Sequence, residues 1–425
     1  MSLAACFYAD DVTGATDVLL QFARRGVRGR LRFDDGDPSG DADGVDAVGV
    51  AGAARGLPTE RIEAKVRPPL AAFARMAPRV VQYKVCSTFD SSPAVGSIGR
   101  ACEVAADVFG ARTIPVAAAQ PELGRYTLFS HHFARSGDGV VHRLDRHPTM
   151  ARHPVTPMRE SNLVEVLREQ TDLPVSSVDL LALRDGAGAD QAGVVVLDGL
   201  EDGDLERAAD LVLRGDAPAF AVGAGGLSMG LARRLGGPPT ELALVAPVPA
   251  VLAVSGSCAP QTAEQVRHAI AAGWQAIPAA AAAADPDRAI EQALVALGAG
   301  RSVVVHSAPA GEAAAWRDAV APPGVAAPPG VAARRGAVAP HRLDAVLARF
   351  VTAALEATPV RRFVLAGGDT AGRVLGHLGA QTAELAGLAG GLPVCRLSGT
   401  LGGVEVVLKG GQVGGPDLLE RVRRP

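Results

Sequence analysis

The first apolar run of the chain ends in a pair of carboxylates, Asp10 and Asp11, and Thr13 follows at the predicted start of a helix. In an open parallel sheet, ligands bind beyond the carboxyl ends of the strands, where the next helix contributes free N–H groups and the positive end of its dipole. Paired carboxylates at such a place can accept a hydroxyl proton, bind sugar hydroxyls or hold Mg²⁺. The alternative is that Asp11 or Thr13 only caps the helix, since both residue types are common caps.

A second set of polar residues follows the fourth predicted strand. Lys84 lies near the end of this strand, and Ser87 and Thr88 come shortly after it. Pro93 suits the first position of a helix with Ser92 as its cap, which places the three polar residues on a strand-to-helix turn. A cation and two hydroxyls at such a turn can hold an organic acid. The alternative is a capped helix beside a solvated lysine.

The stretch 117–160 is long, irregular and polar, and it contains most of the histidines of the chain. Loops of this length inside a compact domain are usually functional or disordered. A zinc site is not favoured, because the i, i+4 histidine spacing of zinc helices is absent and prolines interrupt the segment. Arginine and histidine donors to a carboxylate or phosphate are the better interpretation, with candidates near Arg125, His153 and Thr156.

Glycine-rich turns follow three apolar runs in the second half of the chain, at 255–260, 366–372 and 409–415. Glycine lets backbone N–H groups converge on anionic oxygens, and the first two turns open onto helices. One such turn is a weak signal, but three in one domain favour a site for a nucleotide phosphate chain. None of them is a Walker A loop or a Gly-x-Gly-x-x-Gly fingerprint. A fourth turn, at 223–228, either contacts substrate or allows close helix packing.

These candidates need a scaffold that gathers strand ends, and the apolar pattern predicts one. Short β-branched runs alternate with helical patterns, which is typical of βα units and a parallel sheet. The pattern restarts after a Gly/Pro break near 236–239, and 425 residues exceed what one core usually supports. We predict an α/β protein of two domains, 1–240 and 248–425, each with a mostly parallel sheet flanked by helices, and an active site in the interdomain cleft. The predicted strands are 3–9, 27–33, 47–51, 80–85, 113–116, 193–197, 219–222, 250–254, 302–306, 363–366 and 404–408.

The composition restricts the classes of function. Lysine and arginine number 42 against 45 aspartate and glutamate, so there is no basic excess to neutralise a nucleic-acid backbone. The five cysteines are widely spaced and lack zinc-ligand spacing, as expected of reduced thiols. We find neither a signal peptide nor an apolar tract of about 20 residues that could span a membrane. These features predict a soluble cytoplasmic protein that acts on small molecules and binds neither nucleic acid nor membrane.

The motifs resemble those of the four-carbon acid sugar kinase family, in the same order and over nearly the whole chain. The resemblance implies an N-terminal acid-sugar-binding domain and a C-terminal ATP-binding domain. It further implies transfer of the ATP γ-phosphate to the terminal hydroxyl of a C4 sugar acid such as threonate, erythronate or 3-oxo-tetronate. The segments that carry the resemblance are 9–17, 83–91, 153–158, 255–258, 366–370 and 409–411.

Carried over by position, the resemblance implies nucleotide contacts at Ser257, in the turn 367–370 and at Gly411. The chain departs from the pattern of many members, which have Glu in place of Asp369 and Asn-Phe in place of Gln412-Val413. These departures leave the activity class intact but not the identity of the acid. The predicted nucleotide-binding residues are Ser255, Ser257, Gly367, Gly368, Asp369, Thr370, Gly410 and Gly411.

We predict an ATP-dependent kinase of the C4 hydroxyl of a sugar acid such as D-threonate or D-erythronate. Phosphoryl transfer needs mainly alignment and charge neutralisation, so one carboxylate suffices to take up the hydroxyl proton. We assign this step to Asp11, with Asp10 positioning the sugar or Mg²⁺, although the sequence does not separate their roles. The expected cofactors are ATP and Mg²⁺ with unknown metal ligands, and a homodimer stays open. The predicted substrate-binding residues are Thr13, Lys84, Ser87, Thr88, Arg125, His153 and Thr156.

Three other functions are kept as alternatives. The first is a 3-oxo-tetronate 4-kinase of the same family. The second is a nicotinamide-dependent hydroxy-acid dehydrogenase, which would also have two α/β domains, but the dinucleotide fingerprint is missing. The third is a non-catalytic acid-sugar sensor, which would bind the acid without turnover and would usually carry a DNA-binding segment that is not seen here.

Overall fold

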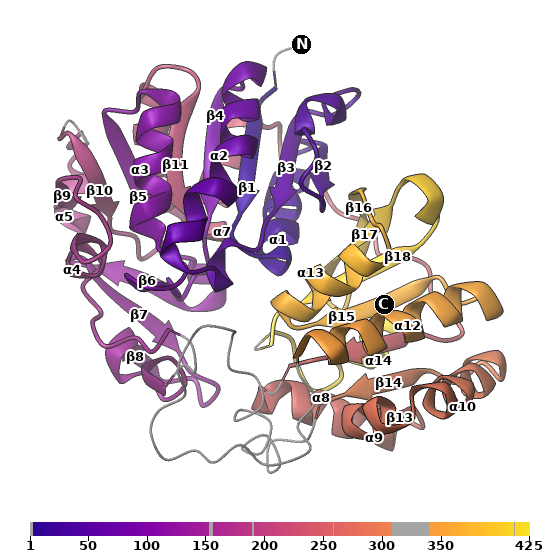
Figure 1. Cartoon of the computed structure of the whole chain (residues 1–425). Helices are drawn as coiled ribbons and strands as arrows, with labels where there is room; N and C mark the ends of the chain where they lie inside the picture. The colour runs from indigo at the N-terminus through magenta and orange to yellow at the C-terminus, as the bar shows by residue number, and fades with distance from the viewer. Residues whose placement is uncertain (1–2, 153–155, 189–190, 258, 308–339, 412) are drawn as a thin grey trace. The chain divides into compact units, whose positions relative to one another are not determined.

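The computed structural model describes residues 3–152, 156–188, 191–257, 259–307, 340–411 and 413–425 (Figure 1). The chain divides into two compact units, Met1–Glu241 and Leu242–Pro425. Strands alternate with helices in both units, and most of the strands within each unit are parallel. The predicted α/β class is therefore confirmed.

The first unit is built on a parallel sheet with the strand order β2-β3-β1-β4-β11-β5-β10-β9. The inner strands are buried along their whole length, as expected for parallel strands that helices cover on both faces. Ala9 at the end of β1 pairs with Ala51 and Lys84, so the chain leaves these three strands at one edge of the sheet. The strands are β1 (Ala5–Ala9), β2 (Gly29–Arg32), β3 (Ala47–Ala51), β4 (Val80–Lys84), β5 (Thr113–Ala117), β9 (Val175–Val178), β10 (Gly193–Leu197) and β11 (Ala219–Gly223).

The helices of the first unit form two layers. Helix α2 packs on α3 on one side of the sheet, and α7 packs on both α1 and α6 on the other (Figure 1). Helix α1 begins directly after β1 with Asp11 as its N-cap, and its buried face presents Val18, Leu19 and Phe22 to the sheet. The helices are α1 (Val12–Ala23), α2 (Thr59–Met76), α3 (Ile98–Phe109), α4 (Leu163–Arg168), α5 (Leu180–Arg184), α6 (Asp202–Arg214) and α7 (Gly225–Leu235).

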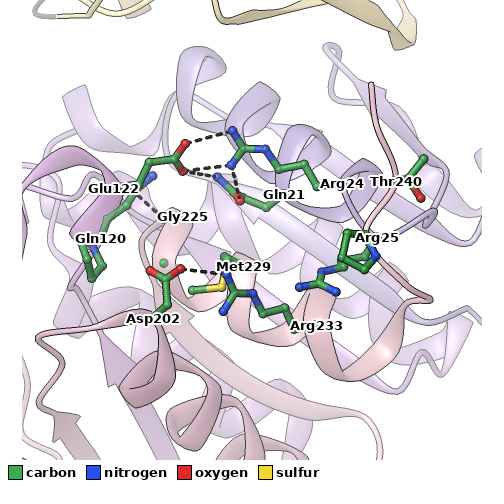
Figure 2. Close-up of a pocket in the computed structure, with 13 residues that line it drawn as sticks. Gln21, Arg24, Arg25, Gln120, Glu122, Asp202, Gly225, Met229, Arg233 and Thr240 are labelled. Atoms are coloured by element: carbon green, nitrogen blue, oxygen red, sulfur yellow. Dashed lines mark hydrogen bonds and ion pairs between the residues drawn. The ribbon is translucent and has the colours of Figure 1, made fainter. Parts of the chain in front are cut away.

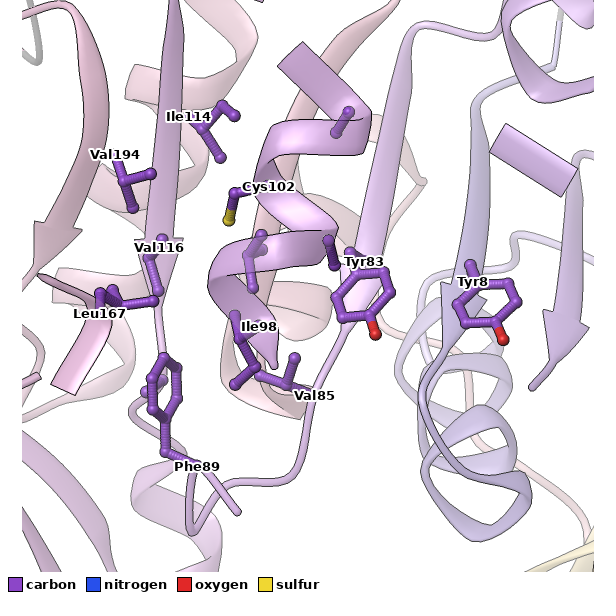
Figure 3. Close-up of a cluster of buried hydrophobic side chains, with 14 of the residues drawn as sticks. Tyr8, Tyr83, Val85, Phe89, Ile98, Cys102, Ile114, Val116, Leu167 and Val194 are labelled. Carbon is purple, nitrogen blue, oxygen red and sulfur yellow. The ribbon is translucent and has the colours of Figure 1, made fainter. Parts of the chain in front are cut away.

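Aromatic side chains of β1 pack over glycines of the next strand. A Cβ atom at Gly49 would lie 2.1 Å from the Phe7 ring, and one at Gly52 would lie 2.1 Å from the Tyr8 hydroxyl. The chain therefore needs glycine at both places to bury these rings. Tyr8 also stacks on Tyr83 of β4 with a centroid distance of 5.6 Å. Figure 3 shows this pair beside the apolar cluster that includes Val85, Phe89, Ile98, Cys102, Ile114, Val116, Leu167 and Val194.

The polar stretch after β5 contains strands that the sequence analysis did not predict. β6 (Arg125–Leu128), β7 (His131–Arg135) and β8 (Val141–Arg143) form a small antiparallel sheet. Short 3-10 turns surround it, namely η3 (Pro121–Leu123), η4 (Leu144–Arg146) and η5 (Met150–Arg152). These strands are short and mostly polar, so they lack the apolar runs on which the prediction relied.

The predicted start of the third helix is wrong. Helix α3 begins at Ile98, and the Ser97 hydroxyl caps it by accepting from the Arg100 N–H. Ser92 instead closes a turn, because its hydroxyl accepts from the N–H of Val95 and donates to the Val95 carbonyl. A longer loop therefore follows β4, and this loop carries Ser87 and Thr88.

The second unit has a mixed sheet with the order β13-β14-β12-β15-β18-β17-β16. Its first five strands are parallel, and β17 and β16 add an antiparallel hairpin. The strands are β12 (Leu252–Ser255), β13 (Gln275–Pro278), β14 (Val303–His306), β15 (Arg362–Ala366), β16 (Thr382–Ala389), β17 (Leu392–Leu397) and β18 (Glu405–Lys409). The helices are α8 (Pro260–Ala271), α9 (Ala279–Ala284), α10 (Pro286–Gly298), α12 (Pro340–Ala357), α13 (Gly368–His377) and α14 (Leu418–Arg423).

None of the helices in the described ranges combines the length and the apolar character that a membrane span requires.

Candidate functional site

The two aspartates after β1 share one arginine. Arg55, in the 3-10 turn η2 (Ala54–Gly56), donates from Nη2 and Nε to the two carboxylate oxygens of Asp10 at 2.7 and 3.2 Å. Its Nη1 donates to Oδ2 of Asp11 at 2.7 Å. Both aspartates are buried, so the guanidinium supplies the opposite charge that buried carboxylates require.

Asp11 has a second task, because it caps helix α1. Its Oδ1 accepts from the backbone N–H of Gly14 at 2.7 Å, and its Oδ2 accepts from the Thr13 hydroxyl at 2.8 Å. The capping alternative is therefore correct for Asp11, but it does not exclude a role in the site. Thr13 contacts Asp11 directly and so belongs to the same network.

The two carboxylates differ in their electrostatic surroundings. Burial raises the pKa of Asp10; Arg55 opposes this rise, and the charge of Asp11 adds to it. Burial acts on Asp11 in the same direction. However, Arg55, Lys84 and the two local hydrogen bonds outweigh it and hold the pKa of Asp11 below its ordinary value. The higher pKa makes Asp10 the stronger proton acceptor of the pair.

Lys84, at the end of β4, is buried rather than solvated. Its Nζ donates to the Val85 carbonyl at 3.0 Å and lies 3.7 Å from Oδ2 of Asp17. Asp17 in turn accepts from the side-chain amides of Gln21 and Gln120, each at 3.2 Å. The alternative of a solvated lysine is therefore wrong. Lys84 adds a fixed positive charge next to the aspartate pair.

A buried histidine holds the loop after β4 in place. His132 of β7 is fully buried, with its Nε2 at 2.8 Å from the Ser87 carbonyl and its Nδ1 at 2.9 Å from the Thr127 hydroxyl. A carbonyl can only accept, so Nε2 carries the proton and Nδ1 accepts from Thr127. Burial lowers the pKa of His132 to about 4. His132 is therefore neutral near pH 7 and positions Ser87 and the neighbouring Thr88.

Two buried polar atoms beside this loop find no hydrogen-bond partner in the described ranges. They are Nε of Arg125 and Oδ1 of Asp90. The remaining contacts of Arg125 go from Nη1 to backbone carbonyls, the shortest being 2.8 Å to Leu123. Burial lowers the pKa of Arg125, and its electrostatic interactions with Cys86 and Asp90 act in the opposite direction. Such unsatisfied groups near polar side chains suit contacts to a ligand.

The remaining substrate-binding candidates have different outcomes. His153 lies outside the described residues. Thr156 is buried. His131 contacts the Ser161 hydroxyl at 2.9 Å, and His147 Nδ1 accepts from backbone N–H groups. The described histidines of this region thus mainly support the fold, and Arg125 is the strongest anion donor that the stretch provides.

A cavity of about 450 Å³ lies in the first unit beside α1 and α7 (Figure 2). Buried Gln21 and Gln120 contribute side-chain amides to its lining. Its size is typical of a small-molecule site. None of the predicted site residues lines it, and Asp17 lies between Gln120 and Lys84. We therefore place the candidate site on the aspartate pair and treat the cavity as its neighbour.

Three arginines line this cavity, and two of them are held by carboxylates. Arg24 forms a bidentate pair with Glu122 at 2.9 and 3.0 Å, and Arg233 donates to Asp202 at 2.8 Å. Arg25 has no ion pair with the carboxylates that the structure describes. Figure 2 shows Arg25 and Arg233 pointing into the same space.

The glycine turn after β11 serves helix packing. A Cβ atom at Gly225 would lie 2.1 Å from Oδ2 of Asp17, and one at Gly226 would lie 2.1 Å from the Ala119 carbonyl. Helix α7 can therefore approach α1 and the end of β5 only with glycine at these positions. Of the two interpretations of this turn, close packing is the one that the contacts support.

The three glycine-rich turns of the second unit come together. They follow β12, β15 and β18, which are adjacent in the sheet. Gly256 N donates to the Ala366 carbonyl at 3.1 Å, and Gly367 N donates to the Lys409 carbonyl at 2.9 Å. A Cβ atom at Gly411 would lie 2.9 Å from the Ser257 hydroxyl oxygen. Turns that lie far apart in the sequence, the first more than a hundred residues before the second, thus form one local surface.

The side chains of these turns are partly committed to the fold. The Ser255 hydroxyl accepts from Ser257 N, and the Ser257 hydroxyl accepts from Ala259 N, each at 3.3 Å. Thr370 is buried, and a Cβ atom at Gly256 would lie 2.1 Å from its hydroxyl oxygen. Asp369 is exposed in the first turn of α13.

The carboxylates of the two units differ in how well they suit a metal ion. No group of three histidine, cysteine or acidic side chains with metal-site geometry occurs among the described residues. Both oxygens of Asp10 contact Arg55, so Asp10 is matched to a guanidinium. The exposed carboxylate of Asp369 in the glycine turns is the better fit to Mg²⁺, which usually takes one or two carboxylates together with substrate phosphates.

Several residues of these sites were missed by the sequence analysis. Arg55 stands alone among small residues and after no clear motif, so no signal marked it. Asp17 and Asp90 lie inside the quoted motifs and could have been named from them. Lys409 also lies inside a quoted motif, whereas Gln120 becomes visible only through its buried contacts.

The chain is similar to known proteins over most of its length. Residues 5–231 match the family model described as a sugar-binding N-terminal domain, and residues 252–419 match that of a nucleotide-binding C-terminal domain. The 3-oxo-isoapionate kinase of Paraburkholderia graminis is 37% identical over 426 residues, covering 93% of this chain and 88% of that protein. The 3-oxo-tetronate kinase of Methylobacterium radiotolerans is 33% identical, covering 93% of each.

Solved structures share the fold. A protein of Salmonella typhimurium LT2 superimposes with a TM-score of 0.75 at 23% identity, covering 100% of this chain and 99% of that one. A Haemophilus influenzae protein gives a TM-score of 0.70 at 21% identity, covering 98% and 99%.

Proposed function

The chain belongs to the four-carbon acid sugar kinase family and is a phosphotransferase, and we propose that it transfers the γ-phosphate of ATP to the terminal hydroxyl of a short-chain sugar acid. The observation that carries the proposal is the convergence of the three glycine-rich turns after β12, β15 and β18. These turns lie in the unit whose relatives bind nucleotides. A buried aspartate pair in the sugar-binding unit supplies the proton acceptor.

The acid is proposed to bind near the loop after β4. Ser87 and Thr88 offer hydroxyls, Lys84 offers a buried positive charge, and Arg125 offers an Nε–H that is unpaired in the described ranges. Charge-assisted hydrogen bonds of this kind are about twice as strong as neutral ones. His153 and Thr156 stay candidates for the same role on the basis of the family resemblance.

For proton removal, the contacts favour Asp10 over our sequence-based choice of Asp11. Asp11 accepts three hydrogen bonds and caps a helix, whereas Asp10 contacts the guanidinium and has the higher pKa. The acceptor must still carry a negative charge, and Arg55 keeps both carboxylates ionised beside the incoming hydroxyl. Asp11 then orients Arg55 and the start of α1.

ATP is proposed to bind through Ser255, Ser257, the turn 367–370 and the Gly410-Gly411 pair. Backbone N–H groups in such turns can surround phosphate oxygens. Asp369 would hold Mg²⁺ together with the phosphates. The ion, when bound, would neutralise phosphate charge and align the phosphates for transfer.

The identity of the acid is the open part of the proposal. Our sequence-based choice was D-threonate or D-erythronate, with 3-oxo-tetronate as the alternative. The two relatives described above are named for 3-oxo acids, and this favours a 3-oxo acid here. The carbonyl of such an acid would be an additional acceptor for Arg125 or Thr88.

The test is a substrate panel. The protein is incubated with Mg-ATP and 3-oxo-tetronate, 3-oxo-isoapionate, D-threonate, D-erythronate or the neutral tetritols, and ADP formation is followed. We expect turnover with a 3-oxo acid and at least about tenfold less with the tetritols, because these lack the carboxylate. Equal turnover of acid and tetritol would contradict the carboxylate site. Acid binding without ADP formation would instead favour a sensor, and thermal stabilisation by NAD but not ATP a dehydrogenase.

A further inference from the structure

Lys409 is a buried lysine whose charge has no carboxylate partner in the described part of the chain. It ends β18 directly before the Gly410-Gly411 pair, and only 1% of its surface is exposed. The side chains around the small space beside it are uncharged, and they include Ser255, Thr262 and Gln265. An isolated buried ammonium is costly to the fold. Such a residue needs a reason other than stability.

The hydrogen bonds of Lys409 point to that reason. Its Nζ donates to the Thr262 hydroxyl at 2.9 Å, to the Gly410 carbonyl at 3.0 Å and to the Gly411 carbonyl at 3.4 Å. The Thr262 hydroxyl also lies 2.9 Å from the Gly411 carbonyl and 3.1 Å from the Ser257 hydroxyl. One ammonium thus connects both glycines with a serine of another turn.

Helix α8 holds the rest of the same loop. The side-chain amide of Gln261 donates to the Gly414 carbonyl at 2.7 Å. The amide of Gln265 donates to the carbonyls of residues 413–415 at 3.0 to 3.1 Å. These contacts bind loop carbonyls and not loop N–H groups. The carbonyls therefore face the helix and Lys409, and the opposite side of the loop is left to present N–H groups.

We infer that Lys409 is a positioning residue for the nucleotide: it fixes the Gly410-Gly411 turn through Thr262 and adds the positive charge that the phosphates complete. The inference rests on the proposed function, in which this turn binds ATP. All three donor directions of the ammonium are used within the protein, so Lys409 acts through the turn and through its field. The phosphate chain is then the counter-charge for a lysine that the described side chains leave uncompensated.

The first experiment replaces Lys409 with methionine, which has similar length and no charge. Lys409→Met should raise the ATP KM and the Mg-ATP dissociation constant, measured by titration calorimetry without acid, by about 10- to 100-fold. The KM for the acid should change less than about twofold, since the acid is proposed to bind in the other unit. The thermal unfolding midpoint should stay equal or rise, because a buried charge is replaced by an apolar group.

A matched pair at Thr262 tests the route through the hydroxyl. Thr262→Val keeps the volume and removes the hydroxyl that links Lys409 to the turn, so the ATP KM should rise about tenfold. Thr262→Ser keeps the hydroxyl and should restore most of the affinity. Equal effects of the two variants would show that the hydroxyl network does not hold the turn.

The pH dependence of ATP binding gives a readout that a purely structural lysine would not change. Burial lowers the pKa of Lys409 to about 8, and bound phosphates favour the charged form. The ATP KM of the wild-type protein should therefore rise as the pH increases beyond about 8. Lys409→Met should lack this rise.

The outcomes separate the two proposals. If the wild-type protein binds no Mg-ATP, the proposed function fails and the inference falls with it. If the wild-type protein binds Mg-ATP and Lys409→Met binds it with the same affinity and pH dependence, only the inference is overturned.

Discussion

The two candidate sites treat buried charge in opposite ways. In the first unit, Asp10 and Asp11 are neutralised by Arg55, and Lys84 lies beside Asp17. In the second unit, Lys409 lies among uncharged side chains. The charge of the aspartate pair is therefore balanced before any ligand arrives, whereas Lys409 is a charge that an anion would balance. Removing the cation should damage the fold at Arg55 in the first unit and ligand binding at Lys409 in the second.

The largest effect is expected at the proton acceptor. Asp10→Asn keeps the shape of the side chain and removes the charge that accepts the hydroxyl proton. We expect kcat to fall by about 10²- to 10⁴-fold, the typical loss for a general base. The ATP KM should change little, because the nucleotide turns belong to the other unit. Steady-state kinetics with the acid that gives turnover measure both quantities.

Asp11→Asn is the matched control for this prediction. It removes one negative charge beside the same Arg55, and asparagine keeps an oxygen for the Gly14 N–H at the start of α1. Its kcat should fall less than that of Asp10→Asn. A larger loss for Asp11→Asn would assign proton transfer to Asp11, as the sequence first indicated.

The second prediction contrasts the two units in stability. Arg55→Met leaves two buried carboxylates without their partner, so the free energy of unfolding should fall by about 3–5 kcal/mol. Urea denaturation near neutral pH measures this loss. Lys409→Met is the control in the other unit and should show no comparable loss. If both variants lose equal stability, the contrast between the units is wrong.

The pH dependence of the Arg55→Met variant sharpens this test. Without the guanidinium, burial raises the pKa of Asp10 further above its value in the unfolded chain, so the folded state binds more protons as the pH falls. The difference in unfolding free energy from the wild-type protein should therefore shrink at about pH 5. A difference that does not change with pH would point to lost packing instead of unpaired charge.

The third prediction concerns His132, which stays neutral in the folded first unit. Its pKa is about 4 in the folded protein, against an ordinary value of 6.5. The unfolded chain therefore binds the extra proton first, and folded stability is lost as the pH falls from 6.5 toward 4. A shift of this size corresponds to a loss on the order of 3 kcal/mol.

His132→Gln measures this contribution, because glutamine can still donate to the Ser87 carbonyl but does not titrate. The unfolding free energies of both proteins are compared across the acidic range. The carboxylates titrate alike in the two proteins there, so the difference reports on His132. The difference in unfolding free energy between the wild-type protein and His132→Gln should become smaller as the pH falls. A constant difference would mean that His132 takes up its proton at the same pH in the folded protein and in the unfolded chain.

The smallest effect is expected in the cavity beside α1. Arg25→Gln removes the one lining arginine that lacks a carboxylate partner in the described residues, yet Asp17 separates the cavity from Lys84. The KM for the acid should change less than about threefold, as is usual for a partly exposed charge. A change of tenfold or more would place the acid in the cavity and move the site away from the aspartate pair.

The sequence was sufficient to predict the α/β class and the strands that carry the sites. Parallel strands buried on both faces read as continuous apolar runs, and Ala47–Ala51 and Gly193–Leu197 were predicted with the observed bounds. The small sheet β6-β7-β8 and the hairpin β16-β17 were missed. In these segments apolar residues alternate with polar or small ones. Only pairing with neighbouring strands makes these segments regular strands.

The sites were predictable where a motif follows a strand and not where a partner comes from elsewhere. Asp10, Lys84 and the glycine turns each follow an apolar run, so their positions at strand ends could be anticipated. Arg55 follows β3 in a turn without any recurring pattern, and its role depends on the contacts with Asp10 and Asp11. Lys409 was visible as a residue, but its burial without a carboxylate is a property of the packed chain.

Asp11 has two roles, and selection acts on both of them through one residue. Its carboxylate caps helix α1 and also contacts Arg55. We therefore expect selection to remove most substitutions there because they destabilise the fold, before any change in activity could spread. Asparagine or serine would keep the cap and remove the charge, since both are good N-cap residues. A family member with such a residue at this position would therefore keep the start of α1 and lose one of the two carboxylates that contact Arg55.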